Sequence, residues 1–152
     1  NGEQQVILNG ENVTAYIRKE EVGNMASATS VYPKVREKLV ELQKELAKKS
    51  NVIMDGRDIG TCVLPDAQVK IYLTASVQTR AKRRYDELEE KGVSCNIEEI
   101  QKDIEDRDYR DMHREMSPLK QAEDAVLLDS SELNVDEVVL AIEKICKEKG
   151  IV

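Results

Sequence analysis

The amino-acid sequence predicts an α/β protein built on a parallel sheet, because short apolar segments alternate with helices that have clear capping signals. The apolar segments are residues 51–54, 69–74 and 125–128. Each is a continuous apolar run, which is typical of strands covered on both faces, and each is followed by helical sequence directly or after a loop. Ligands of such sheets bind beyond the carboxyl ends of the strands, where we expect the functional residues.

Capping residues mark the helices of this region. Ser76 is a candidate N-cap for a helix that runs to Lys91, and Gly92 is its stop signal. Two more helices begin at capping boxes, in which an Asn and a Glu stand three residues apart. These pairs are Asn96 with Glu99 and Asn134 with Glu137.

The first 50 residues predict a smaller unit of a β-hairpin and two helices. Asn9-Gly10 lies between two short apolar stretches and is typical of a two-residue hairpin turn. Helical sequence follows over residues 19–30, and Pro33 then opens a second helix that continues to Lys48. We therefore expect two domains, residues 1–50 and residues 51–152.

Composition excludes several classes of protein. The 152 residues carry a formal charge of −7, which argues against a protein that grips duplex DNA through many phosphates. The absence of Trp and Phe argues against stacking platforms for single strands. The sequence lacks the long apolar run of a membrane helix and the pattern of a signal peptide. Its three scattered cysteines suggest neither disulfides nor a zinc site, so we expect a soluble, cytoplasmic protein.

Arginine is concentrated in one part of this acidic chain. Six of the nine arginines lie between positions 80 and 114. Guanidinium groups are the preferred protein ligands of phosphate oxygens, so two arginine-bearing helices joined by the loop at Gly92 resemble a lid over a polyphosphate. The six are Arg80, Arg83, Arg84, Arg107, Arg110 and Arg114. A solvated helix surface with internally paired charges is the alternative explanation.

One stripe of the helix that follows Asn96 changes from apolar to ionic. At about 100° per residue, the stripe that begins with three isoleucines continues through Arg107, Asp111 and Arg114. The isoleucines are Ile97, Ile100 and Ile104. Charged groups on an inward face are costly unless they line a cavity and meet a counter-charge. The stripe therefore indicates an anion site near the end of this helix.

The turn after the first apolar segment is the second candidate site. It reads Asp55-Gly-Arg-Asp-Ile-Gly-Thr, in which two glycines permit tight turns while Arg57 and Asp58 project from the end of the expected strand. An ordinary turn with an exposed ion pair is the alternative.

Taken together, these motifs resemble the bacterial cytidylate kinases. The resemblance follows their order through nearly the whole chain and includes, besides the turn at Asp55, four further segments. These are Lys70-Ile-Tyr-Leu-Thr-Ala-Ser, Arg80-Ala-Lys-Arg-Arg-Tyr, Arg107-Asp-Tyr-Arg-Asp and Ser117-Pro-Leu-Lys. The resemblance implies the fold of P-loop nucleoside monophosphate kinases, with residues 1–50 as a nucleotide-binding insert and a helical lid over about residues 80–114. It also implies transfer of the γ-phosphoryl group of ATP to CMP or dCMP, with Mg²⁺, giving CDP or dCDP.

The resemblance also implies a role for each matching residue. Ser27, Arg36 and Asp58 match the positions that read the cytosine base. Arg57 and Arg107 match those that hold the acceptor phosphate, while Asp111 and Arg114 match contacts to the sugar. Arg80, Arg83 and Arg84 match lid residues that close over the donor nucleotide and the transferring phosphoryl group, and Ser130 and Ser131 are expected near the adenine. We expect Arg57, Arg80, Arg84 and Arg107 to be catalytic.

One family motif is missing from this sequence. None of its seven glycines is followed by Lys, so the phosphate-binding Gly-x-x-x-x-Gly-Lys is absent. We therefore expect a chain that corresponds to the C-terminal two-thirds of the enzyme and is inactive alone. The sheet should have a gap between residues 51–54 and 69–74, which the missing segment would fill as a companion chain. A CMP-binding module without catalysis, a kinase for another monophosphate and an associating fragment with exposed sheet edges remain alternatives.

Overall fold

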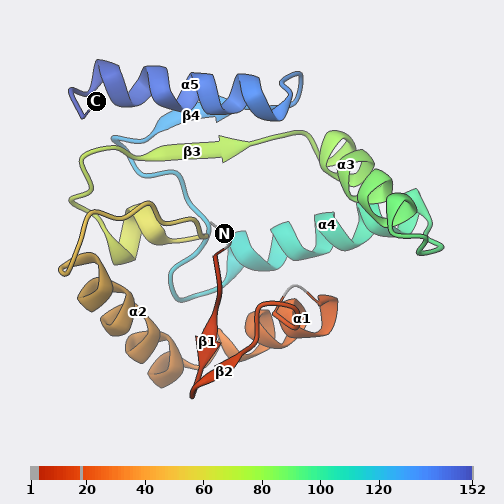
Figure 1. Ribbon diagram of the computed structural model, residues 1–152, viewed down its shortest axis with the longest axis horizontal. Coiled ribbons are helices and arrows are strands. Elements are labelled where there is room, and N and C mark those ends of the chain that lie inside the picture. The colour runs from red at the N-terminus through yellow and green to blue at the C-terminus, as the bar shows by residue number, and fades with distance from the viewer. Residues whose placement is uncertain (1–3, 18, 152) are drawn as a thin grey trace. The chain divides into compact units, whose positions relative to one another are not determined.

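The computed structural model describes residues 4–17 and 19–151 and divides the chain into two compact units, Asn1–Glu45 and Leu46–Val152. Figure 1 shows the order of their helices and strands.

The N-terminal unit contains the predicted hairpin and helices. Strands β1 (Ile7–Leu8) and β2 (Glu11–Asn12) pair antiparallel, and their turn has positive φ angles of 51° at Asn9 and 89° at Gly10. These are the angles that favour Asn-Gly in a two-residue hairpin. Helix α1 spans Glu20–Thr29, and α2 spans Pro33–Ala47 with its last residues in the second unit. The hairpin and both helices are thus confirmed.

The C-terminal unit has the predicted α/β character. Strand β3 (Ile71–Thr74) pairs in parallel with β4 (Val126–Asp129). Three helices accompany these strands, with α3 and α4 packed against each other (Figure 1). They are α3 (Val77–Glu90), α4 (Ile97–His113) and α5 (Val135–Glu148).

The caps form where the sequence predicts them. Ser76 accepts a hydrogen bond from the amide of Thr79 at the start of α3. Asn96 caps α4 by accepting from the amides of Glu98 and Glu99, which is the Asn half of the predicted capping box. At α5, Asn134 and Glu137 exchange both hydrogen bonds of the capping box. Gly92, with a φ of 71°, follows the end of α3. Its positive φ explains why glycine is the stop signal there.

The prediction of a strand at residues 51–54 is wrong. Within the described ranges this segment has no hydrogen-bonded neighbouring strand and takes no regular form, and Ile53 is fully exposed. A strand is stable only when its backbone groups find partners on an adjacent strand. The apolar composition of residues 51–54 is therefore not sufficient to make a strand.

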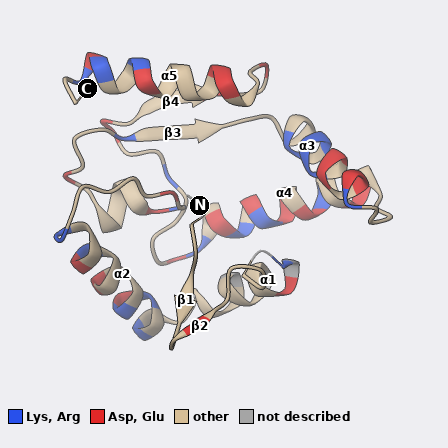
Figure 2. Ribbon diagram, in the orientation of Figure 1, with Lys and Arg blue, Asp and Glu red and all other residues tan. Residues whose placement is uncertain are grey.

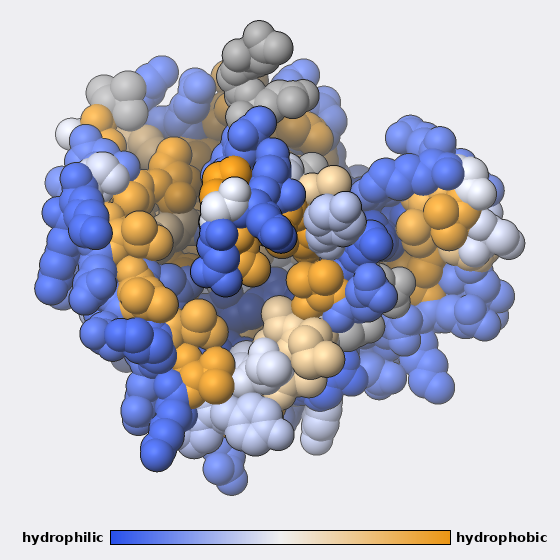
Figure 3. Space-filling view, turned by 60° about the horizontal axis from the view of Figure 1, so that its bottom comes forward, coloured by the Kyte–Doolittle hydropathy of each residue, from blue (hydrophilic) through white to orange (hydrophobic). Residues whose placement is uncertain are grey.

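Few apolar side chains are enclosed. Among the described residues, the buried hydrophobic ones are Val63, Ala75 and Ala81. Leu73 and Leu127 project from opposite faces of the two-stranded sheet, because Leu127 pairs with the neighbour of Leu73, and both are more than half exposed. The expectation of a sheet covered on both faces is therefore wrong. Figure 3 shows hydrophobic residues at the surface among hydrophilic ones.

No helix within residues 4–17 and 19–151 is both long and apolar enough to cross a membrane.

A buried lysine fixes the beginning of β3. The Lys70 side chain is only 7 % exposed, and its ammonium group donates to both carboxylate oxygens of Asp124, at 2.9 and 2.7 Å, and to the carbonyl oxygen of Pro65. These bonds join β3 to the loop before it and to the loop before β4. The hydrogen bond from Lys70 lowers the pKa of the Asp124 carboxyl.

Asp124→Asn is expected to destabilise the chain near neutral pH, because the buried ammonium group of Lys70 loses its counter-charge. The lowered pKa of Asp124 means that its contribution is present above the unfolded-state pKa and is lost as the pH falls below about 4. Urea unfolding at pH 7 and at pH 3 measures this. The variant should differ from wild type mainly at pH 7, and an equal difference at both pH values would contradict the assignment. Asp66→Asn, which also changes one exposed aspartate, is the control.

Candidate functional site

The turn between residues 55 and 63 has a defined shape. A Cβ at Gly56 would lie 2.8 Å from Cγ1 of Ile59, so only glycine fits there without a shift. A short π-helical segment, η1 (Ile59–Val63), follows. The carbonyl oxygen of Asp58 accepts hydrogen bonds from the amides of Thr61, Cys62 and Val63, at 3.3, 2.8 and 3.3 Å. Asp58 is buried, so the turn holds it in a fixed place.

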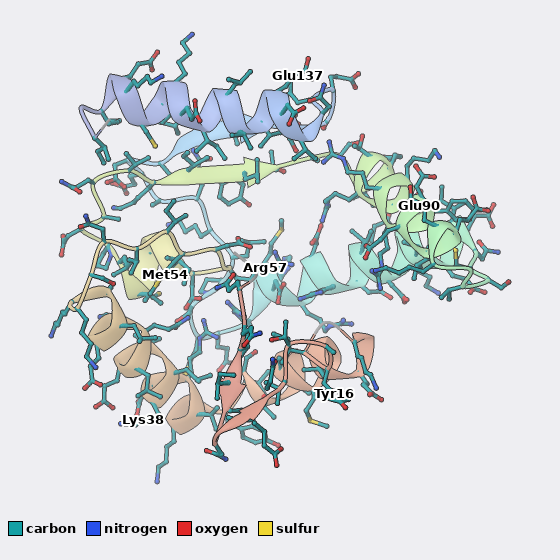
Figure 4. The ribbon with its side chains drawn as sticks, in the orientation of Figure 1. Tyr16, Lys38, Met54, Arg57, Glu90 and Glu137 are labelled. Atoms are coloured by element: carbon teal, nitrogen blue, oxygen red, sulfur yellow. The ribbon has the colours of Figure 1, made fainter. Side chains whose placement is uncertain are left out.

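Arg57 connects this turn to the C-terminal part of α4. Its Nε donates to Oδ2 of Asp111 at 2.8 Å, across 54 positions in the sequence. Figure 4 shows Arg57 beside α4. The Asp111 side chain is only 8 % exposed, whereas that of Arg57 is 43 % exposed. The guanidinium group is thus oriented by a buried carboxylate and remains accessible to solvent.

Asp111 is the centre of an arginine cluster that also includes two residues of α4 and its end. Arg107 Nε lies 4.0 Å from Asp111 Oδ2, and an Arg114 terminal nitrogen lies 3.7 Å from Asp111 Oδ1. The arginine cluster is therefore Arg57, Arg107 and Arg114 around one carboxylate. The guanidinium groups of Arg57 and Arg107 are about half exposed and can donate charge-assisted hydrogen bonds to an anion.

The chain after α4 folds back onto this cluster. Ser117, which precedes Pro118, has a φ of 50°, unusual for a residue with a side chain. The amide of Leu119 then donates to the carbonyl oxygen of Asp111 at 2.8 Å, and Arg114 Nε donates to the carbonyl oxygen of Ser117 at 2.7 Å. These bonds hold the C-terminal end of α4 against the following loop.

The predicted inward stripe of α4 is confirmed in part. Ile100 and Ile104 are partly buried, and Asp111, about three and two turns further on, is buried. Ile97 and Arg107, which belong to the predicted stripe, are exposed. The alternative of an internally paired, solvated helix end does not describe Asp111, because its shortest ion pair is with Arg57 from another element. Figure 2 shows both signs of charge along α3 and α4.

Arg80 is held by two elements besides its own helix α3. Its Nε donates to the carbonyl oxygen of Ala75 at 3.0 Å, just after β3. Its two terminal nitrogens donate to the two carboxylate oxygens of Asp108 on α4, at 3.1 and 2.5 Å. Asp108 is not among the site residues predicted from the sequence. Its position three residues before Asp111, and so near the same face of the helix, is the signal that would have found it.

Arg83 is directed toward the loop after β4. It donates to the carbonyl oxygen of Ser130 at 2.6 Å and to that of Leu133 at 3.0 Å. In the same place, the hydroxyl of Ser131 accepts from the Ser76 amide at 2.8 Å. Ser131 also donates to Asp129, which lowers the pKa of that carboxyl. This network joins the carboxyl ends of β3 and β4 to the N-terminus of α3.

Arg84 is held least firmly of the three arginines of α3. It forms an ion pair of 2.9 Å with Glu87 on the same helix, and both side chains are more than a third exposed. Hydrogen bonds from Lys91 and Arg84 lower the pKa of Glu87. Exposed pairs of this kind contribute little to stability, so Arg84 can leave Glu87 for another anion at small cost.

The remaining candidates lie in the first unit. Arg36 is buried in α2. Ser27 falls within α1, but its side chain lies outside the described residues. The structure therefore brings together Arg57, Arg107, Asp111 and Arg114 of the second unit, whereas a common site of Ser27 and Arg36 with Asp58 stays a prediction.

Comparison with known proteins agrees with the resemblance seen in the sequence. The family model described as cytidylate kinase matches residues 1–148. Cytidylate kinases of Lactobacillus gasseri and Lactobacillus johnsonii are each 54 % identical over 148 residues, which is 97 % of this chain and 64 % of theirs. A Streptococcus pneumoniae cytidylate kinase is 54 % identical over 138 residues, or 91 % of this chain and 62 % of its own. This chain thus spans somewhat less than two-thirds of the length of these relatives, and it belongs to the cytidylate kinase family.

Proposed function

We propose that this chain is part of a nucleoside monophosphate kinase that transfers the γ-phosphoryl group of ATP to CMP or dCMP. The observation that carries the proposal is the arginine cluster around Asp111, in which the half-exposed guanidinium groups of Arg57 and Arg107 are accessible to an anion. Membership of the cytidylate kinase family supports the same substrates.

The arginine cluster is suited to a nucleoside monophosphate. Arg57 and Arg107 are each about half exposed and have N–H groups to offer to phosphate oxygens. Asp111 and Arg114 are buried more deeply and are the proposed contacts to the sugar hydroxyls. The buried carboxylate would serve twice, because it orients Arg57 and accepts a hydrogen bond from the sugar.

Recognition of cytosine needs both donors and an acceptor. Cytosine presents O2 and N3 as acceptors and its 4-amino group as a donor, whereas uracil has N3–H and a 4-oxo group in place of the last two. A guanidinium group from Arg36 and a carboxylate from Asp58 match the cytosine pattern. The proposed site also includes Ser27. The burial of Arg36 and Asp58 supports a recognition role, because buried polar groups discriminate strongly against a mismatched ligand.

Phosphoryl transfer needs mainly positioning and neutralisation of charge. Arg80 and Arg84 from α3 are the proposed contacts to the transferring phosphoryl group, and Arg57 and Arg107 hold the acceptor. Arg83 donates to the carbonyl oxygen of Ser130 and so holds the loop after β4. It therefore belongs to the proposed binding region of the donor nucleotide. No dedicated general base is required in this scheme.

Mg²⁺ is the proposed companion of ATP. Within the described part of the chain, no three His, Cys, Asp or Glu side chains come together to hold a metal ion. The described residues therefore form no resident metal site of this kind. Mg²⁺ commonly binds through substrate phosphates with only one or two carboxylates from the protein.

We further propose that the chain alone binds CMP without catalysing transfer. The absence of Gly-x-x-x-x-Gly-Lys removes the backbone cradle and lysine for the donor phosphates. The unpaired segment at residues 51–54 and the exposed Leu73 support a place for an additional strand supplied by a companion segment.

A substitution at Arg57 tests the arginine cluster. Arg57→Ala should weaken CMP binding about tenfold or more in titration calorimetry, because it removes charge-assisted hydrogen bonds to the phosphate. Arg110→Ala is the matched control, since it removes an exposed arginine from α4. Equal affinities of the two variants, or a wild-type chain that does not bind CMP, would overturn the proposed site.

The second prediction concerns the base. Arg36→Ala and Asp58→Asn should each reduce the preference for CMP over UMP by about tenfold. Arg36→Ala removes a hydrogen-bond donor to cytosine, and Asp58→Asn introduces an amide that can donate to the 4-oxo group of uracil. The ratio of the two dissociation constants is the measurement, and melting temperatures identify a variant that has unfolded. Unchanged discrimination in folded variants would show that the base is read elsewhere.

The third prediction concerns activity. The purified chain should form no CDP from CMP and ATP, and adding a peptide that contains the Gly-x-x-x-x-Gly-Lys segment of a close relative should restore transfer. Intact mass under denaturing conditions must first show a single species of 17.2 kDa. Transfer catalysed by that single species would contradict the proposal.

A further inference from the structure

We infer that Asp108 is a positioning residue for Arg80. It holds the guanidinium group of Arg80 at the place of the phosphoryl group that the proposed reaction transfers to a bound cytidine monophosphate. The inference rests on the proposed function. Asp108 is not one of the site residues predicted from the sequence.

The geometry leaves Arg80 little freedom. Arginine has five N–H donors. Three of them are used in the structure, one by the carbonyl oxygen of Ala75 and two by the carboxylate of Asp108. A bidentate pair fixes the plane of the guanidinium group, and the third bond fixes its rotation about the side chain. Two N–H groups remain for a ligand.

Burial favours a permanent pair over a transient one. The Asp108 side chain is 18 % exposed and that of Arg80 is 33 % exposed. Ala75 lies directly after β3 and is buried. The anchor of Arg80 is therefore the carboxyl end of a strand, where ligands of α/β proteins bind. By contrast, the ion pair of Arg84 with Glu87 is exposed and lies within one helix.

Helix α4 relates the two arginines to each other. Asp108 and Asp111 lie three residues apart on α4, and they hold Arg80 from α3 and Arg57 from the turn. Residues at this spacing lie near the same face of a helix. Helix α4 thereby sets the separation between Arg57, the proposed ligand of the CMP phosphate, and Arg80, the proposed ligand of the transferred phosphoryl group.

CDP is the informative probe, because its second phosphate is the group that the proposed reaction transfers. Titration calorimetry with CMP and with CDP on the complete chain gives the affinity ratio of the two nucleotides. Asp108→Asn should lower the affinity for CDP about tenfold and change that for CMP less than about twofold. Arg80→Lys, which removes the fork but keeps the charge, should have the same selective effect.

Two further variants separate positioning from charge and stability. Asp103→Asn makes the same change of charge at an exposed position of α4 and should leave both affinities unchanged. Asp108→Glu restores a carboxylate and should recover part of the CDP affinity. Melting temperatures accompany every titration, so that a loss of folding is recognised as such.

Each other outcome decides against the inference in a different way. Tighter CDP binding by Asp108→Asn would show that Asp108 competes with the phosphate for Arg80. An equal loss for CMP and CDP would show a purely structural role, and unchanged affinities would show no role. A wild-type chain that binds neither nucleotide would overturn the proposed function, and the inference with it.

Discussion

The buried carboxylate of Asp111 is the constraint on which the candidate site depends. Taking a charged group out of water costs several kcal/mol, roughly, and the cost is recovered only with well-placed counter-charges. Asp111 obtains them from Arg57, Arg107 and Arg114. The arginines in turn need the carboxylate, because three guanidinium groups close together repel one another. The pairing thus fixes the shape of the cluster and leaves the guanidinium groups of Arg57 and Arg107 accessible from solvent, which is what an anion site requires.

The predictability of each feature follows from how local its cause is. The helix starts at Ser76 and Asn134 depend on residues within one turn, and the structure has them where the capping signals predict. The inward position of Asp111 followed from the helical period alone. The strand at residues 51–54 depends on a neighbour along the sheet, so its apolar composition misled. The contacts from Arg57 to Asp111 and from Arg80 to Asp108 span 54 and 28 positions, and no local pattern specifies such partners.

In the second unit, polar contacts between elements fix much of the arrangement that apolar burial fixes in larger domains. Its enclosed apolar side chains are few and small. Lys70 joins the beginnings of β3 and β4 through Asp124, and Arg83 joins α3 to the loop after β4. Each connection places a charged group on carbonyl or carboxylate oxygens of another element. Partly buried bonds of this kind are directional, so they determine orientation more sharply than apolar contacts of the same number.

The candidate site and the connections between elements share the same residues. The residues that orient the candidate site are themselves the connections between elements: Arg80 joins α3 to α4, and Asp111 joins α4 to the turn at Arg57. A ligand anion that contacts these arginines must share them with the carboxylates that hold the elements together. Ligand binding and the packing of α3 against α4 are therefore coupled, because a guanidinium group that moves toward a phosphate weakens its bond to the carboxylate of the other element. Partial burial protects these pairs from screening by salt, so the coupling should persist at physiological ionic strength.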